Sequence, residues 1–227
     1  MSEKISVLIP TFNREKYIKT SLQSILEQTY INLDVLIYDD GSTDNTISII
    51  KEIMKTDDRI KLIENTKNNG VGYARNILLK NCNTKYACWH DSDDISNINR
   101  IREQLKYLSK DTLVFAFWSW LKFTKGVWHP TKIQKTTRAF ATIMFPVNKN
   151  ITFKEDMRIG GEDWDWIKRM KEIYKEGRCV DKLLYYVRFH DDRIGVWKRK
   201  IKANIPIEIQ KKLGYKELIK YYKEHYE

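Results

Sequence analysis

The sequence predicts an α/β fold in which helices flank a mostly parallel central sheet. Apolar runs of strand length alternate with segments of helical periodicity through the first 95 residues, and polar residues follow the ends of those runs. The chain has 227 residues, 42% of them hydrophobic, which is enough for one domain with a substantial core, or for one domain and an extension.

Four expected strands and three expected helices make up this first part. The strands are short, largely apolar runs, and the helices have apolar residues three and four positions apart. In chain order they are strand 5–9, helix 18–26, strand 33–38, helix 47–54, strand 60–63, helix 73–79 and strand 86–90. This alternation is typical of parallel βαβ units.

The second part has a less regular order of elements. We expect helix 98–108, strand 112–120, strand 140–145, helix 164–174 and strand 180–189. Residues 115–130 interleave aromatic side chains with lysines. We interpret them as core strands, and a stacking platform for a bound partner is the alternative.

Charge divides the chain unevenly. Residues 1–95 carry 12 Lys and Arg against 14 Asp and Glu, whereas residues 96–227 carry 29 against 16. This suggests that the second part faces an anionic partner, and a generally lysine-rich composition is the alternative. The basic run 197–202 suits an anionic membrane surface or a nucleic acid backbone, and equally a solvated face.

Composition also indicates the cellular compartment of the protein. The three cysteines are not in metal-ligand spacing and indicate reduced thiols. No apolar stretch approaches the roughly 20 residues that span a bilayer. The first strand begins too early to leave room for a signal peptide. We therefore expect a soluble, cytoplasmic protein.

Polar residues follow three of the expected strands where each ends. Pro10 and Thr11 follow the first, Asp39-Asp40 the second, and the turn 91–94 the fourth. The carboxyl ends of parallel strands meet at one edge of a sheet, which is where ligands bind in such folds. We expect these three clusters to lie together.

The turn 91–94, Asp-Ser-Asp-Asp, sets three carboxylates close together. Neighbouring like charges raise one another's pKa and strain a fold unless a cation neutralises them. A hard divalent ion takes oxygen ligands and bridges to phosphate oxygens. A helix N-cap or turn is the alternative here, and a turn at Gly41 is the alternative for Asp39-Asp40.

Five segments of the chain carry a family resemblance. They are SVLIPTFNREKYIKTSLQSILEQTY, DVLIYDDGSTDNT, NNGVGYARN, YACWHDSDD and GGEDWDWIKRM. In this order and spacing they resemble the family-2 glycosyltransferases of the GT-A fold, over residues 4–194. The resemblance implies transfer of a sugar from a nucleotide-activated donor, a UDP-sugar or similar, to an acceptor hydroxyl, with inversion at the anomeric carbon.

The resemblance also implies a metal site. Asp91 and Asp93 match the family's Asp-X-Asp motif, which binds the donor diphosphate through Mn²⁺ or Mg²⁺. Asp93 is the leading ligand, and Asp91 contacts the metal, its water or the ribose. His190 stands in a segment resembling the family's Arg-X-His and is a metal ligand, a diphosphate contact or a structural residue. We expect Asp94 to be structural and His90 to be packed.

Nucleotide contacts are implied for further residues. Asp39 and Asp40 accept hydrogen bonds from the base or ribose, and Pro10 and Thr11 shape the base pocket. Arg75 points towards the nucleotide in the family, and a surface helical arginine is the alternative.

Catalysis is implied for the acidic pair Glu162 and Asp163 at a helix start. Asp163 aligns with the base that takes the proton of the acceptor hydroxyl. Acidic residues also stabilise helix N-termini, so capping is the alternative. Trp164 and Trp166 are interpreted as core residues or as faces on which a sugar stacks.

The predicted organisation is a GT-A domain, 1–195, with a nucleotide-binding half (1–95) and an acceptor half (96–195), followed by a basic C-terminal extension, 196–227. The acceptor is a glycan, a lipid-linked glycan or another hydroxyl compound. Contact of the basic part with an anionic membrane, which would make the protein peripheral, or with nucleic acid is left open. Two other functions remain: a nucleotidyltransferase, in which the acidic pair has no clear role, and a basic nucleic-acid-binding protein on a degenerate transferase scaffold.

Overall fold

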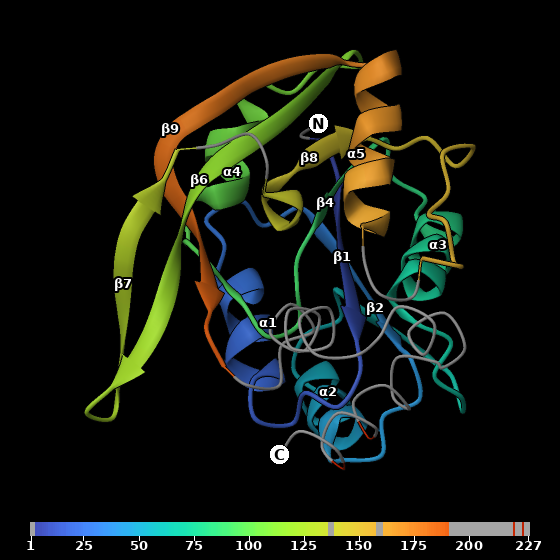
Figure 1. Ribbon diagram of the computed structural model, residues 1–227, viewed down its shortest axis with the longest axis vertical. Coiled ribbons are helices and arrows are strands. Elements are labelled where there is room, and N and C mark those ends of the chain that lie inside the picture. The colour runs from blue at the N-terminus through green and yellow to red at the C-terminus, as the bar shows by residue number, and fades with distance from the viewer. Residues whose placement is uncertain (1–2, 136–138, 158–160, 191–219, 221–223, 225–227) are drawn as a thin grey trace.

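The structure is a computed structural model that describes residues 3–135, 139–157, 161–190, 220 and 224 (Figure 1). Of the expected extension, only residues 220 and 224 fall among them. The described elements, in chain order, are β1 Ile5–Thr11, α1 Ile18–Leu26, β2 Leu33–Asp39, α2 Thr46–Met54, β3 Ile60–Glu64, α3 Val71–Asn81, β4 Tyr86–Trp89, β5 Ile95–Ser96, α4 Arg100–Leu105, β6 Thr112–Thr124, β7 Val127–Gln134, the 3₁₀ helix η1 Phe140–Thr142, β8 Met144–Pro146, α5 Glu162–Ile173 and β9 Lys175–Arg188.

The first half of the sheet is parallel, as predicted. β1 lies between β2 and β4 and pairs with both in parallel, and β2 pairs in parallel with β3. The register sets Thr11 opposite Asp39, the last residues of β1 and β2. The strands that carry the predicted polar clusters therefore end side by side.

Beyond β4 the sheet becomes mixed. The strand order is β3-β2-β1-β4-β8-β6-β9-β5, and β7 pairs with β6 at the side. β8 runs antiparallel to β4 and β6, whereas β9 runs parallel to β6 and antiparallel to β5. Because β5 directly follows the turn after β4, its pairing with β9 brings the end of β9 next to that turn.

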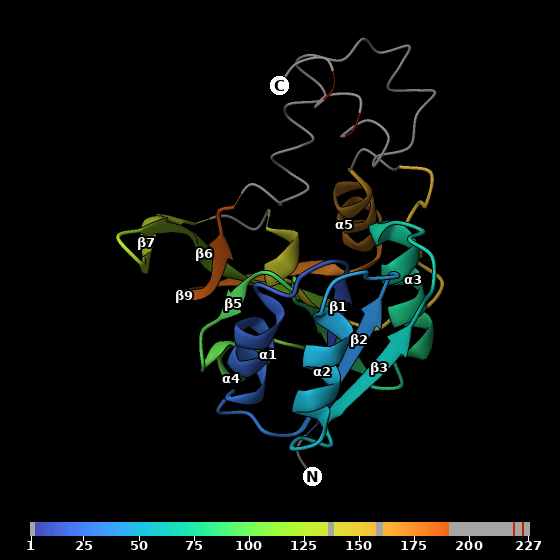
Figure 2. The same cartoon turned by 90° about the horizontal axis from the view of Figure 1, so that it is seen from below.

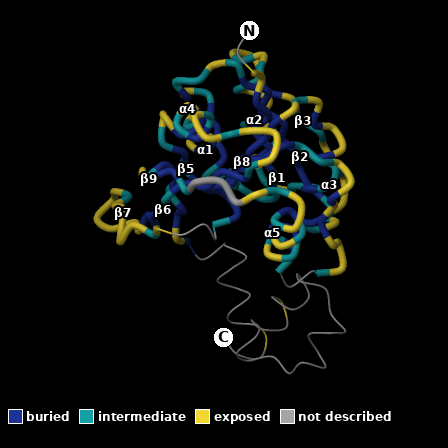
Figure 3. The backbone as a smooth tube through the Cα atoms, turned by 90° about the horizontal axis from the view of Figure 1, so that it is seen from above, coloured by how far each residue is buried: buried dark blue, intermediate teal, exposed yellow. Residues whose placement is uncertain are grey.

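Helices cover both faces of the sheet (Figure 2). On one face, α1, α2 and α4 pack with alternate side chains of β1, namely Ile5, Val7 and Ile9. On the other face, α3 and α5 pack with Leu8 and with Trp89 of β4. Period-two alternation in β1 divides the apolar side chains between these two cores, and the buried residues follow the sheet (Figure 3). The predicted α/β fold is confirmed.

Two stretches differ from prediction. Residues 140–145, expected as one strand, form η1 and the short β8, because the N–H and Oγ1 of Thr142 both donate to the Ala139 carbonyl and close a turn. The aromatic strand continues past residue 120 into a β6–β7 hairpin. Lys125 and Gly126 at its tip have positive φ, 51° and 80°, which suits a two-residue hairpin turn.

No helix among the described residues is long and apolar enough to cross a lipid bilayer.

Candidate functional site

The three polar clusters meet at the edge where β1, β2 and β4 end. The N–H of Asp40 donates to the Thr11 carbonyl at 2.9 Å, and the N–H of His90 donates to the Leu8 carbonyl at 3.1 Å, which ties both following turns to β1. Pro10 and Thr11 are buried at the end of β1. The Thr11 hydroxyl has no hydrogen-bond partner among the described residues.

Asp39 and Asp40 organise the loops beside this edge. The Asp39 carboxylate accepts from the N–H and hydroxyl of Ser42 at 2.7 and 2.6 Å. The Asp40 carboxylate accepts from the N–H groups of Asn69 and Gly70 at 2.9 and 2.7 Å. Burial raises the pKa of both carboxyls, and these hydrogen bonds partly offset the rise. Both side chains therefore shape the loops around Gly41, as in the alternative interpretation, and their predicted contact with the nucleotide stays a prediction.

The turn at Gly41 requires glycine. Its φ is +79°, and an added Cβ would lie 3.0 Å from the backbone of Lys67. Both constraints disfavour a side chain, so the loop that carries Asp39 and Asp40 has a fixed shape.

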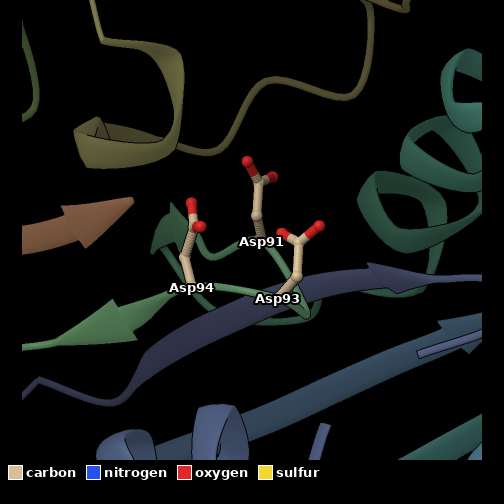
Figure 4. Close-up of side chains that lie close together, drawn as sticks. All are labelled: Asp91, Asp93 and Asp94. Atoms are coloured by element: carbon tan, nitrogen blue, oxygen red, sulfur yellow. The ribbon is translucent and has the colours of Figure 1, made fainter. Parts of the chain in front are cut away.

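The turn after β4 gathers three carboxylates. Single oxygens of Asp91, Asp93 and Asp94 lie within 4.8 Å of one another. Figure 4 shows the three side chains rising to the same side of the turn. The Asp94 N–H donates to the Asp91 carbonyl at 3.0 Å, and the Asp91 N–H donates to the Tyr185 hydroxyl at 3.0 Å. Backbone bonds therefore hold the acidic turn in place.

Two basic side chains lie against Asp93. Its Oδ2 accepts from Nε of Arg14 at 3.1 Å and lies 3.2 Å from Nε2 of His190. The His190 ring stacks on Tyr17 at 4.2 Å between centroids. His190 was predicted to be a metal ligand, a diphosphate contact or a structural residue, and the structure places its ring against Asp93. Arg14 and Tyr17 were not predicted, because their only sequence signal is that they follow the end of the first strand.

Asp94 has a structural role, as expected. Its Oδ1 accepts from the N–H of Arg188 at 3.0 Å, and its carbonyl accepts from the Arg188 guanidinium at 3.3 Å. That guanidinium also donates to the Thr20 hydroxyl at 2.8 Å. Burial lowers the pKa of Arg188, and Asp94 and Asp93 act in the opposite direction. Arg188 thus joins α1, the acidic turn and β9.

His90 is packed, as expected. Its ring is fully buried between the hydroxyls of Ser21 and Ser96, at 2.9 and 3.2 Å. Burial, with the charges of Arg100 and Arg188, holds the pKa of His90 well below its ordinary value. The ring is therefore neutral at pH 7.

Glu162 and Arg75 form a buried ion pair. Oε1 of Glu162 accepts from a guanidinium nitrogen of Arg75 at 3.0 Å, and both side chains are less than one tenth exposed. The guanidinium lies over the Phe140 ring at 4.2 Å. The pair joins the start of α5 to α3, so the structure gives both residues a partner that the sequence did not predict.

Asp163 lies one residue further along α5 and is half-buried. Its Oδ1 accepts from the N–H of Trp164 at 2.8 Å. Trp166 is fully buried in the core and donates to the Ile151 carbonyl, whereas Trp164 is 51% exposed. The core interpretation therefore holds for Trp166 only.

Comparison with protein families decides the assignment. The profile of Glycosyl transferase family 2 matches residues 6–184. This chain belongs to that family. Its relatives include a Rickettsia felis protein described as an uncharacterized glycosyltransferase, 34% identical over 82% of this chain and 33% of its own length. An Escherichia coli relative, UDP-Glc:alpha-D-GlcNAc-diphosphoundecaprenol beta-1,3-glucosyltransferase WfgD, is 36% identical over 50% of this chain and 44% of its own length. The chain thus spans between one third and one half of the length of these family-2 relatives.

Solved structures of similar proteins support the GT-A fold. TarS of S. aureus in complex with UDP-GlcNAc has a TM-score of 0.66 and 21% identity, over 88% of this chain and 65% of that one. The mannosyltransferase PcManGT of Pyrobaculum calidifontis in complex with GDP-Man and Mn²⁺ has a TM-score of 0.64 and 18% identity, over 89% of this chain and 61% of that one. At these identities the likeness concerns the fold of this family-2 chain.

Proposed function

We propose that this chain is a metal-dependent, inverting glycosyltransferase that moves a sugar from a nucleotide-sugar donor of the UDP-sugar class to an acceptor hydroxyl. The observation that carries the proposal is the meeting of Asp91 and Asp93 with the turn of Asp39 and Asp40 at one sheet edge, in a chain of family 2. Ligands of parallel sheets bind at this position.

The acidic turn fits a divalent cation. Single oxygens of three carboxylates lie within 4.8 Å of one another, and carboxylate oxygens are the ligands that Mn²⁺ and Mg²⁺ prefer. Asp93 and Asp91 would hold the ion, with His190 beside them, while Asp94 is engaged by β9. A bound ion would offset the charge that develops on the departing nucleoside diphosphate.

Arg14 gives the turn a positive charge of its own, and His190 stands beside it. Both lie against Oδ2 of Asp93, the leading ligand. Their positions also suit contact with a donor diphosphate, because guanidinium groups bind phosphate oxygens by charge-assisted hydrogen bonds.

A nucleotide pocket beside the metal is supported by Thr11. Its hydroxyl is buried without a hydrogen-bond partner in the described part of the chain, which is unusual unless a ligand or water supplies one. Pro10, Asp39 and Asp40 form the neighbouring wall. The carboxylates of Asp39 and Asp40 accept hydrogen bonds from loop N–H groups. We therefore propose that their main role is to set the shape of the pocket.

Asp163 is the proposed general base. It lies in the first turn of α5, and its neighbour Glu162 fixes that turn through Arg75. A carboxylate positioned in this way can take the proton of an acceptor hydroxyl as the sugar carbon is attacked. Trp164 presents an exposed ring beside it, on which a sugar can stack.

Donor and acceptor classes follow from the relatives. The E. coli relative's name specifies UDP-Glc and a diphosphoundecaprenol acceptor, and TarS was captured with UDP-GlcNAc. We extend the UDP-sugar donor and a lipid-linked glycan acceptor to this chain as proposals. Nothing in the described site favours a nucleotidyltransferase or a nucleic-acid-binding protein over this function.

Product analysis tests the function. The chain is incubated with nucleotide sugars and Mn²⁺, and the released nucleotide is identified. We expect nucleoside diphosphate, from transfer or from slow donor hydrolysis. In a parallel incubation with nucleoside triphosphates and sugar 1-phosphates, release of pyrophosphate would instead identify a nucleotidyltransferase. No turnover in either incubation, together with salt-sensitive nucleic acid binding, would identify the binding protein.

A further inference from the structure

The β6–β7 hairpin extends well away from the body of the molecule (Figures 1 and 2). Its outer part, residues 122–134, is largely exposed. Three large apolar side chains there face solvent: Phe123 is 54% exposed, Val127 55% and Ile133 43%. Phe123 also packs against Trp128 across the hairpin, at 5.1 Å between ring centroids. Several exposed large apolar side chains on one protruding arm make it a candidate interaction surface.

The charge of this part of the chain has one sign. Residues 112–154 contain no Asp or Glu. The outer hairpin carries Lys122, Lys125 and Lys132, all exposed, and these residues form none of the ion pairs found in the described structure. The arm therefore complements an anionic partner.

A second copy of the chain is a poor fit to this arm. Among the described strands, β7 pairs with β6 alone, which leaves an edge to which another strand could add. However, Pro130 in mid-strand has no N–H to donate, and Lys132 stands on the same edge strand; both features oppose strand addition. The pairing of β6 with β7 also shifts register between Ser119 and Leu121, which interrupts the edge.

The apolar side chains identify the kind of anionic partner. Aromatic rings can stack on bases or sugars, but the aliphatic Val127 and Ile133 gain only by transfer into an apolar phase. Phe123 and Val127 stand on either side of the tip, next to Lys122 and Lys125. Apolar side chains beside lysines are typical of segments that insert into the headgroup region of a membrane. We propose that the outer hairpin docks on the surface of a lipid bilayer that contains anionic lipids.

The hairpin is joined directly to the candidate site. β6 pairs with β9, setting Leu121 opposite Arg188, and the Phe189 N–H donates to the Leu121 carbonyl at 2.9 Å. The rings of Trp120 and Phe189 pack edge to face, with 6.0 Å between their centroids. The next residue is His190, which lies against Asp93. Docking of the arm would hold the site near the membrane surface. This consequence, but not the docking itself, rests on the proposed transferase function.

Vesicle co-sedimentation of the full chain tests the docking. Vesicles of phosphatidylcholine alone are compared with vesicles that also contain phosphatidylglycerol, without any nucleotide. One variant combines Phe123→Ser with Val127→Ser, and another combines Lys122→Glu with Lys125→Glu. The matched controls are Ile31→Ser with Ile98→Ser, exposed apolar residues elsewhere, and Lys4→Glu with Lys110→Glu, exposed lysines elsewhere. An unchanged unfolding temperature establishes that each variant is folded.

We expect the wild type to sediment with anionic vesicles, both hairpin variants to bind at least about tenfold more weakly, and both controls to bind as the wild type does. Equal sedimentation of the hairpin variants, equal binding to neutral vesicles, or no binding at all would overturn the proposal. So would a loss in the hairpin variants of binding to single-stranded DNA with no change in vesicle binding. The vesicle experiment contains no sugar donor, so a lack of vesicle binding would not bear on the proposed transferase activity. In the same way, a lack of transferase activity would not change the interpretation of vesicle binding.

Discussion

Nε2 of His190 lies 3.2 Å from Oδ2 of Asp93, which joins the end of β9 to the turn after β4 across 97 positions of the chain. The acidic turn follows β4, in the parallel half of the sheet. The ring of His190, which follows β9 in the second half, lies against this turn. β5 makes this return possible, because it pairs with β9 immediately after the turn. The candidate site is therefore a joint product of both halves.

Tyr185→Phe is expected to loosen the acidic turn. The Tyr185 hydroxyl accepts from the Asp91 N–H, and its removal leaves a buried donor without that partner. We expect the free energy of unfolding to fall by about 1–2 kcal/mol in urea titrations, with weaker Mn²⁺-dependent nucleotide binding. Tyr186→Phe is the control, since Tyr186 points to the other side of the strand. Equal effects of the two changes would contradict the role given to Tyr185.

Glu162→Gln is expected to destabilise the fold strongly. It leaves the buried Arg75 charge without its carboxylate, at a cost of about 3–5 kcal/mol. The double variant Arg75→Met with Glu162→Leu should recover most of this loss, because it removes both charges. Glu64→Gln, which breaks the exposed pair with Lys51, should cost less than about 1 kcal/mol. A small effect of Glu162→Gln on chemical unfolding would mean that the pair does not hold α5 to α3.

Asp163→Asn is expected to reduce sugar transfer by about 10²- to 10⁴-fold while leaving nucleotide binding nearly unchanged, because the amide cannot take a proton. Asp165→Asn in the same helix serves as the control. Its carboxylate pairs with Lys154 and Arg169, so its loss should affect stability more than turnover. Normal turnover of the Asp163 variant would remove it as the base.

Asp57→Asn is expected to lower stability at neutral pH only. Hydrogen bonds from Arg59 hold the pKa of the Asp57 carboxyl below its ordinary value. A folded-state pKa below the unfolded value of about 3.9 stabilises the fold above that pH, and the contribution is lost as pH falls through the folded pKa. Wild type and variant should differ by about 0.5–1 kcal/mol at pH 7 and converge below pH 4.

The control for this pH dependence is Asp58→Asn, at an exposed neighbouring position. Urea titrations of both variants across pH 3 to 7 should show convergence for Asp57 alone. A constant difference across this range would indicate that the Asp57 carboxylate is not stabilised by Arg59.

The periodicity of apolar residues and the polar residues at the strand ends were enough to predict the parallel half of the fold. Continuous apolar runs such as Ile5–Ile9 leave little choice, since they must be buried on both faces. Residues 140–145 were mispredicted because local apolar content does not reveal the turn that Thr142 closes with Ala139. The strand predicted over residues 112–120 continues into a hairpin that was not predicted. Its two-residue turn depends on positive φ at Lys125 and Gly126, and only the glycine is a signal for that turn in the sequence.

The order of strands and helices predicted which polar clusters the sheet brings together, but several side-chain pairs between distant elements were missed. The carboxylates of turn 91–94 and the pair Glu162-Asp163 stand together in the chain. By contrast, Arg14 reaches Asp93 from another strand end, and Arg75 meets Glu162 from another helix. Such contacts depend on how helices pack on the sheet, which the periodicity of one segment does not specify.

The most direct test of the central claim is the unfolding temperature of wild type and Asp93→Asn with UDP in Mn²⁺ or in EDTA. If the acidic turn holds the metal that binds the donor diphosphate, UDP with Mn²⁺ should raise the wild-type unfolding temperature by about 5 °C or more, and EDTA should abolish the shift. The variant should show no shift in either condition. An equal shift in the variant, or one that EDTA leaves intact, would contradict the metal site at Asp93.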